Sequence, residues 1–194
     1  GDIEAMDRLI ADVLTLARGL GHEAVQPVVL AELLAERVEA IPGAAGKVQI
    51  ESVDLTLEVP VGALRRILDN LLENALRYGG GQPVVLKARA DHGCCRIGVL
   101  DRGPGIPAAE LEAVFRPFFR LEASRSVETG GSGLGLAIVR QLAAAQGWSV
   151  SLQAREGGGL AAWRLADPDP IRPPKQLAVE GHALGFNMFV ADIH

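Results

Sequence analysis

The pattern of residues 60–78 predicts one long helix that is apolar over most of its circumference. Pro60 suits the first turn of a helix, because its missing N–H is not needed there, and the glycines at 79–81 stop the helix. A chain of 194 residues, 48% of them hydrophobic, is long enough to build one domain with a core around such a helix. The apolar positions are Leu64, Ile67, Leu68, Leu71, Leu72 and Ala75.

The remaining stripe of this helix is polar. Its members fall at i, i+3, i+4, i+7 and i+8 and therefore share one face: Asn70, Glu73, Asn74, Arg77 and Tyr78. Two asparagines one turn apart are poor helix formers, so a reason outside the helix is expected for them. The stripe either hydrogen-bonds to a neighbouring loop or forms a metal site, since an amide oxygen is a hard, neutral ligand that suits Mg²⁺.

Two glycine-rich loops lie further along the chain. The first, residues 101–106, follows a predicted strand and begins with Asp101, whose carboxylate can accept a hydrogen bond from an exocyclic amine such as that of adenine. The second, residues 131–136, opens a predicted helix, so its backbone N–H groups favour a phosphate. It is neither a P-loop, which needs a following Gly-Lys-Ser/Thr, nor a dinucleotide fingerprint. Each loop alone is a weak signal.

A cluster of aromatic residues lies between the two loops. Three of the five phenylalanines fall within residues 115–120. They form a small core under the loop, anchor a mobile lid, or do both. Residues 121–133 are polar and glycine-rich without periodicity, which indicates a mobile loop.

The remaining patterns predict further helices and strands. At the N-terminus, heptad spacing indicates a helix that either packs on its own domain or forms half of a dimer-forming bundle: Ile3, Met6, Ile10, Val13, Ala17 and Leu20. The other expected elements are a helix at 30–40, extended chain at 48–59, strands at 84–90 and 94–100, a helical turn at 111–115, a helix at 134–146, and strands at 148–154 and 160–165.

Charge and composition exclude some classes of function. The net charge is -5 with no long basic run, which argues against nucleic acid as a partner. No apolar run reaches the length of a membrane helix, so membrane attachment is expected only through segments outside this chain. The adjacent Cys94 and Cys95 cannot form an ordinary intrachain disulfide, which fits a reducing cytosol.

Taken together in order and spacing, four of these segments resemble the catalytic domain of sensor histidine kinases, most closely the osmosensor type. The resemblance covers roughly residues 2–165. Its motifs are an N box at 70–75, a first glycine box at 101–106, an F box at 115–119 and a second glycine box at 131–136. Each is weak to moderate alone, but the ordered set is specific.

The resemblance implies an α/β fold, a two-layer sandwich of a mixed sheet and helices. This is the Bergerat-type ATP-binding fold of the gyrase, chaperone, histidine kinase and mismatch-repair superfamily, here preceded by a helix from a dimerisation bundle. The implied cofactors are ATP and Mg²⁺. Asn74 is expected to coordinate Mg²⁺ with Asn70 close by, Asp101 to bind the adenine amino group, and Glu73 to polarise the attacking histidine. The other residues expected to contact nucleotide are Arg77, Tyr78, Gly103, Gly105, Ile106, Phe118, Arg120, Arg125, Ser132, Gly133, Leu134, Gly135 and Leu136, with Arg120 and Arg125 as candidates for the γ-phosphate.

Three positions are informative against the family pattern. Related hydrolysing ATPases place a glutamate one turn before the metal asparagine to activate water; here that position is Asn70, which favours phosphotransfer. Ser132 stands where most relatives have threonine, and Arg102 where asparagine or aspartate is commoner.

The resemblance also predicts the domain organisation. Residues 1–20 are expected to end the second helix of a dimerisation domain, 21–30 to form a linker, and 31–167 the catalytic domain. Residues 168–194 are a proline-rich tail, either native or added for expression. The phosphoacceptor histidine would lie in a preceding region absent here, so we expect a fragment unable to autophosphorylate alone. His22 follows a glycine break and lies too near Asn74 in sequence, which indicates a linker residue.

The parent is expected to be a homodimeric inner-membrane protein, with this part in the cytoplasm, that passes phosphate to the receiver domain of a response regulator. Two other functions stay open. A stand-alone serine kinase of the anti-sigma-factor type is disfavoured by the N-terminal helical seam. A non-catalytic module that binds nucleotide or partners is disfavoured by the intact Asn74, Asp101 and glycine set.

Overall fold

The computed structural model describes residues 6, 10, 12–14, 23–91, 94–121, 131–152 and 188–193. Within these ranges the chain forms a five-stranded sheet in the order β2-β4-β5-β7-β6 and a separate two-stranded sheet of β1 and β3. β2 runs parallel to β4, and the other neighbours in the large sheet are antiparallel, so the sheet is mixed as predicted. The strands are β1 (Gln26–Val29), β2 (Val48–Glu51), β3 (Thr56–Val59), β4 (Val84–Asp91), β5 (Cys94–Leu100), β6 (Ser149–Ser151) and β7 (Met188–Ile193).

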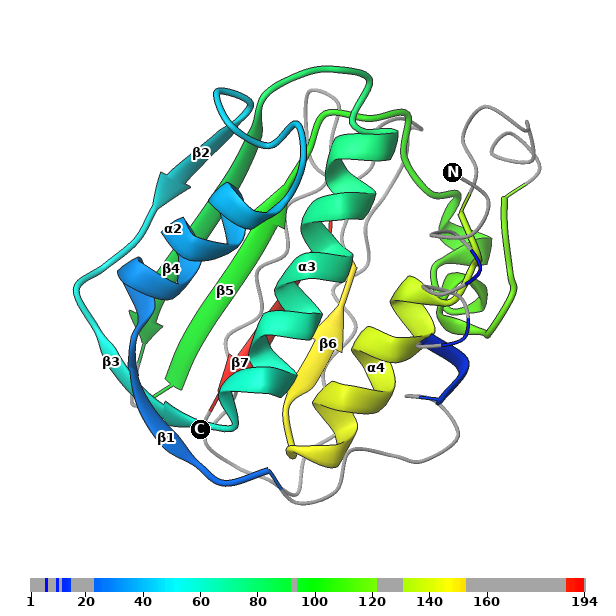
Figure 1. Ribbon diagram of the computed structural model, residues 1–194. Coiled ribbons are helices and arrows are strands. Elements are labelled where there is room, and N and C mark those ends of the chain that lie inside the picture. Colours follow the sequence, from blue (N-terminus) through cyan, green and yellow to red (C-terminus); the bar gives the residue numbers. More distant parts are fainter. Residues whose placement is uncertain are drawn as a thin grey trace.

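Three helices cover one face of the large sheet and give the two-layer arrangement (Figure 1). They are α2 (Leu30–Ala40), α3 (Val61–Tyr78) and α4 (Gly135–Ala145), and two short 3-10 turns, η1 (Ala108–Glu110) and η2 (Ala113–Phe115), precede α4. The predicted helices at 30–40, 60–78 and 134–146 are therefore confirmed within a residue or two. The predicted helical turn at 111–115 is present as η2 over its last three residues, and η1 lies before it.

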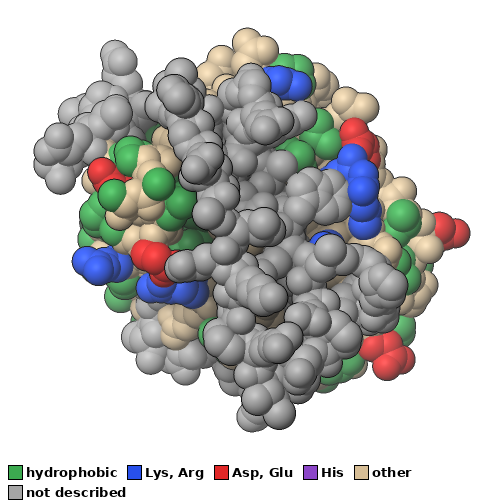
Figure 2. All heavy atoms as spheres, turned by 180° about the vertical axis from the view of Figure 1, so that it is seen from behind, with side chains coloured by type: hydrophobic (Ala, Val, Ile, Leu, Met, Phe, Trp, Pro, Cys, Tyr) green, Lys and Arg blue, Asp and Glu red, His purple; other side chains and the backbone are tan. Residues whose placement is uncertain are grey.

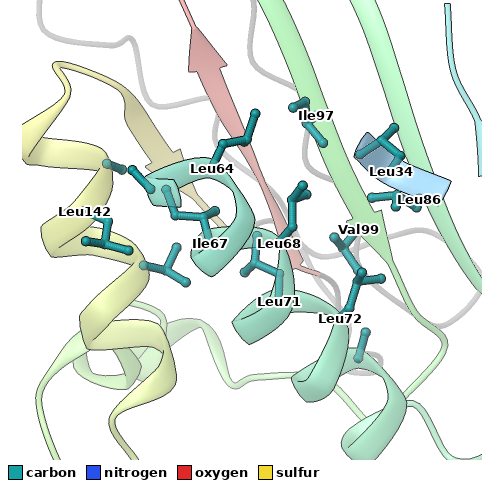
Figure 3. Close-up of a cluster of buried hydrophobic side chains, with 14 of the residues drawn as sticks. Leu34, Leu64, Ile67, Leu68, Leu71, Leu72, Leu86, Ile97, Val99 and Leu142 are labelled. Carbon is teal, nitrogen blue, oxygen red and sulfur yellow. The ribbon is translucent and has the colours of Figure 1, made fainter. Parts of the chain in front are cut away.

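α3 lies at the centre of the helical layer, and its apolar positions are buried on several sides. The side chains of Leu64, Leu68 and Leu72 are at most 1% exposed. In Figure 3 they lie on the side of α3 that faces Leu86, Ile97 and Val99 of the sheet and Leu34 of α2, whereas Ile67 lies on the side of α3 toward Leu142 of α4. Burial on this scale is the main source of stability for such a domain.

The extended segment predicted at 48–59 divides between two sheets. β2 pairs with β4 in the large sheet, whereas β3 pairs with β1. Residues 52–55 between them leave the first sheet and enter the second, with Leu55 O accepting a hydrogen bond from Leu30 N at 2.9 Å. The small sheet thus connects the start of α2 to the start of α3.

The position between β5 and β6 is taken by β7. This strand comes from within the stretch that the sequence assigns to the tail, so part of that stretch joins the sheet. The strand predicted at 160–165 lies outside the described residues. The strand predicted at 148–154 is described as β6 over its central residues.

The described residues near the N-terminus, at 6, 10 and 12–14, are helical, in agreement with the heptad pattern. Three of its apolar side chains are exposed: Met6, Ile10 and Val13. No helix among the described residues is long and apolar enough to cross a membrane. Seen from behind, the described charged side chains lie in several separate places rather than in one patch (Figure 2).

Candidate ATP-binding site

The polar stripe of α3 faces the start of α4. Asn70 and Asn74 are half-buried on this face. The side-chain nitrogen of Asn70 donates a hydrogen bond to the Arg66 carbonyl at 2.8 Å, which holds the amide with its oxygen turned away from the helix backbone. The stripe was interpreted either as bonding to a neighbouring loop or as a metal site. Both interpretations apply to the place where α3 meets the start of α4.

Gly135 brings the second glycine box against these asparagines. A Cβ at Gly135 would lie 2.9 Å from Asn70 Oδ1 and 3.4 Å from Asn74 Nδ2. The first of these distances is closer than real Cβ contacts allow without movement, so the approach depends on a residue with no side chain. The helix N-terminus and the two amides thus enclose one small region.

Gly131, four residues earlier, meets the other end of the stripe. A Cβ there would lie 2.7 Å from Arg77 Nη1 and 3.5 Å from the Tyr78 hydroxyl oxygen. Arg77 is exposed apart from this contact, and its guanidinium adds positive charge beside the N-terminus of α4. Both features attract an anionic group such as a phosphate.

Asp101 is the buried carboxylate of the site. Its side chain is 1% exposed, and Oδ1 accepts a hydrogen bond from Gly103 N at 2.8 Å. Burial raises the pKa of Asp101 to about 7, while the Gly103 N–H acts in the opposite direction. A carboxylate this deeply buried needs a specific role, and acceptance from an amine is one that its position can serve.

Two glycines allow Asp101 and its loop to pack closely against the C-terminal end of α3. A Cβ at Gly79 would lie 3.4 Å from Asp101 Cβ, and one at Gly103 would lie 2.2 Å from the Tyr78 carbonyl oxygen. The second distance leaves no room for any side chain. Gly105 has a φ of 95°, a conformation that favours glycine. The first glycine box is thus built by close packing against the C-terminus of α3.

The F box and the second glycine box are in contact. Phe118 N donates to Gly133 O at 3.0 Å, joining the F box to the second glycine box. Both residues have positive φ, 62° and 72° respectively, and the Phe118 side chain is 64% exposed. A positive φ is unfavourable for phenylalanine, which marks this junction as a strained position. Leu134 N donates a hydrogen bond to the Ser132 hydroxyl oxygen at 3.3 Å.

Several predicted residues have other surroundings. Ile106 and Leu134 are 8% and 0% exposed and belong to the hydrophobic core, so they support the two loops from beneath. Leu136, Glu73 and Arg120 are half-buried. Arg125 lies outside the described residues.

Arg140, which the sequence reasoning missed, fastens the F box to α4. Its guanidinium lies 5.2 Å from the centre of the Phe115 ring, and Nη2 donates to the Phe115 carbonyl at 3.2 Å. Arg140 is the one charged residue in the apolar sequence of α4, and that isolation was a signal of a specific contact.

The model of the family described as histidine kinase-, DNA gyrase B- and HSP90-like ATPases matches residues 61–167. The sensor protein CutS of Streptomyces coelicolor is 38% identical over 166 residues, which is 81% of this chain and 40% of CutS. This chain therefore spans well under half the length of that relative.

Two solved structures are similar in fold and sequence. Full-length ShkA in complex with AMPPNP has a TM-score of 0.68 and 32% identity, covering 81% of this chain and 35% of ShkA. The mycobacterial sensor histidine kinase MprB has a TM-score of 0.61 and 30% identity, covering 70% of this chain and 93% of that structure.

The chain belongs to the family of histidine kinase-, DNA gyrase B- and HSP90-like ATPases. Within that family its relatives are sensor histidine kinases, and it carries the ATP-binding catalytic domain of this class. The fold and the family that the four boxes predicted are both confirmed.

Proposed function

We propose that this domain binds Mg·ATP and, in its parent protein, transfers the γ-phosphate to a histidine of a dimerisation domain. The observation that carries the proposal is the meeting of Asn70 and Asn74 with Gly135 at the N-terminus of α4. Amide oxygens and phosphate oxygens together form the ligand set that Mg²⁺ prefers. Backbone N–H groups at the same place favour the phosphates.

The residues fit a magnesium ion. Asn70 uses its nitrogen for the Arg66 carbonyl, which leaves the amide oxygen for a ligand. The space that a Cβ at Gly135 would fill is bounded by both amides. Asn70 and Asn74 would hold the ion, which would neutralise charge on the phosphates during transfer.

The other residues have distinct roles. Asp101 accepts from the adenine amino group, Arg77 and Tyr78 flank the phosphates, and Glu73, next to Asn74 on the helix, orients the attacking histidine. Backbone groups at 103, 105 and 132–136 approach the nucleotide, and Phe118, Arg120 and Arg125 belong to the lid that covers it. With Asn70 where hydrolysing relatives place a glutamate, the site favours transfer to a side chain over transfer to water.

The domain organisation follows from this function. Residues 1–20 end the second helix of a dimerisation domain, 21–30 form a linker, and 31–167 form the catalytic domain, to whose sheet residues 188–193 add a strand. The parent is a homodimer that phosphorylates a response-regulator receiver domain, and it is anchored in the inner membrane with this domain in the cytoplasm.

Calorimetry with a non-hydrolysable ATP analogue, with and without Mg²⁺, tests the binding step. We expect Mg²⁺-dependent binding by the chain and about tenfold or more weaker binding by Asn74→Ala and Gly135→Ala. Arg65→Ala is the matched control, because Arg65 lies on the same helix and pairs with Glu36 at the surface. Binding that is indifferent to Mg²⁺, or equal in all four proteins, would contradict the proposed metal site.

A second experiment tests the transfer. The chain is mixed with Mg·ATP and a histidine-bearing dimerisation domain in trans, and the acid stability of the phosphorylated product is measured. Acid-labile, base-stable phosphate on the added domain supports a histidine kinase. Acid-stable phosphate would favour the serine kinase, and ATP binding without any transfer would favour the non-catalytic module.

A further inference from the structure

The N-terminus of α3 has no cap of its own. Pro60 occupies the capping position without a side-chain hydrogen bond, and the first turn contains no acidic residue. The first N–H groups of a helix have no partner within the helix, and together they carry a partial positive charge. The first N–H groups of this 18-residue helix therefore need an acceptor from another part of the chain.

Glu23 supplies that acceptor from far away in the sequence. Its Oε1 accepts from Gly62 N at 2.6 Å and its Oε2 accepts from Ala63 N at 3.0 Å. Both oxygens of one carboxylate are thus used on consecutive N–H groups, 39 and 40 residues further along the chain. A charged acceptor makes these hydrogen bonds stronger than neutral ones.

Gly62 leaves room for the Glu23 carboxylate because it has no side chain. A Cβ at that position would lie 2.7 Å and 2.8 Å from the two oxygens of Glu23. An alanine is normally better than glycine inside a helix, so the glycine has a local cost that the close approach of the carboxylate explains. The glycine and the two hydrogen bonds therefore belong to one contact.

A second contact lies about one turn further along the same helix. Asp12, in the helical N-terminal segment, forms an ion pair with Arg66 at 3.2 Å, and the side chains are 15% and 33% exposed. The Arg66 carbonyl is the group that accepts from Asn70. The segment before the domain therefore touches α3 immediately before the N box.

We propose that the chain is latched to α3 at two points, with Glu23 as the positioning residue and Asp12 as the second contact. The latch fixes the N-terminal segment against the helix that carries Asn70 and Asn74. Its consequence for phosphotransfer rests on the proposed function: Asp12 lies in the helix assigned there to the dimerisation domain, so the latch holds the catalytic domain against that helix.

Amide hydrogen exchange by NMR tests the contact itself. Gly62 N and Ala63 N have no partner within α3, so their protection reports Glu23 directly. We expect exchange at these two amides to be roughly tenfold faster in Glu23→Ala than in the unchanged chain. Glu58→Ala is the matched control, since Glu58 is an exposed glutamate on β3, close in sequence to the same helix start. It should leave both amides unchanged.

Gly62→Ala makes the test specific to the latch. In the unchanged chain its Cβ displaces the carboxylate, so it should accelerate exchange at Ala63. In the Glu23→Ala background there is no carboxylate to displace, so Gly62→Ala should not accelerate exchange at Ala63. The same acceleration in both backgrounds would overturn the assignment of Gly62 to this contact.

Trypsin distinguishes a latch from a simple helix cap. Arg18 is the single Lys or Arg between Asp12 and Glu23. Cleavage after Arg18 should be about tenfold faster in Glu23→Ala and Gly62→Ala than in the unchanged chain or Glu58→Ala. Faster amide exchange without faster cleavage would overturn the latch. Binding of the ATP analogue, measured on the same proteins, should be the same in these variants as in the unchanged chain. If the unchanged chain itself did not bind the analogue, that result would count against the proposed function and not against the latch.

Discussion

At the scale of single residues, Asp101 shows how burial creates a chemical property. The carboxyl is 1% exposed and its ionised form is held by one backbone hydrogen bond, so desolvation dominates and the pKa rises to about 7. In the unfolded chain the pKa returns to its ordinary value near 3.8. The native state therefore holds a proton between these two values that the unfolded state has already lost.

The sign of the resulting pH dependence follows from linkage. As pH rises from about 4 to about 7, Asp101 lowers the free energy of unfolding by up to about 1.4 kcal/mol per pH unit. Above about 7 the group is ionised in both states, and its contribution to the slope vanishes. Urea unfolding of the chain at several pH values measures this slope.

Asp101→Asn is the matched variant, because the amide oxygen can still accept from Gly103 N but cannot titrate. The difference in unfolding free energy between Asp101→Asn and the unchanged chain should grow in favour of the variant as pH rises from 4 to 7, and then level off. A difference that is constant over this range would show that Asp101 does not titrate there in the native state.

At the scale of elements, the contact between α4 and the F box helps to fix the F box next to the second glycine box. Arg140 joins the two by a cation–π contact and a hydrogen bond to the Phe115 carbonyl. Three residues after the end of η2, Phe118 N donates a hydrogen bond to Gly133 O, so the F box is also joined to the residues just before α4. α4 therefore positions the F box and the second glycine box, and it presents its own N-terminus to the asparagines.

Arg140→Ala should lower the free energy of unfolding by about 1 kcal/mol, because it removes the cation over the Phe115 ring and one hydrogen bond. It should also accelerate amide exchange at Phe118, which lies just beyond the loosened turn. Thermal unfolding and hydrogen exchange measure the two effects.

Glu112→Gln is the control for Arg140. Glu112 approaches Arg140 Nη1 at 3.8 Å, but its side chain is 93% exposed, so its loss should change stability little. If Arg140→Ala and Glu112→Gln were indistinguishable, the contact with Phe115 would have no energetic role.

At the scale of the whole molecule, α3 joins the core to the site. Its apolar faces contact the sheet, α2 and α4 (Figure 3), and its remaining stripe carries the asparagines. Because one rigid helix has both tasks, packing of the core fixes the height and rotation of Asn70 and Asn74 relative to α4. Core and site are therefore expected to fail together when α3 is loosened.

Leu72→Ala should destabilise the domain by about 2–5 kcal/mol, because Leu72 is 0% exposed at the centre of the core and its removal leaves a cavity. Leu76→Ala, one turn later on the same helix but only partly buried, should cost clearly less. Urea unfolding compares the two. Equal losses would mean that the centre of the core does not lie where α3 faces the sheet.

Local patterns were sufficient for most elements and for the composition of the site. The period of 3.6 residues identified α2, α3 and α4, because burial of one helical face leaves a repeat that neighbouring residues reveal. The glycine boxes were visible for a similar reason: backbone approach to a phosphate or to a carboxylate requires glycine at particular positions of a loop. Asn70, Asn74 and Asp101 followed from these patterns and from the resemblance that they carry.

Contacts between distant segments could be learned only from the tertiary structure. The division of residues 48–59 between two sheets, the insertion of β7 between β5 and β6, and the capping of α3 by Glu23 each join residues with no common local pattern. The approach of Gly135 to Asn70 has the same character, because it depends on how α3 and α4 pack. Periodicity reports which face of an element is buried but not what buries it, and the free energy that selects the partner arises only when the whole core assembles.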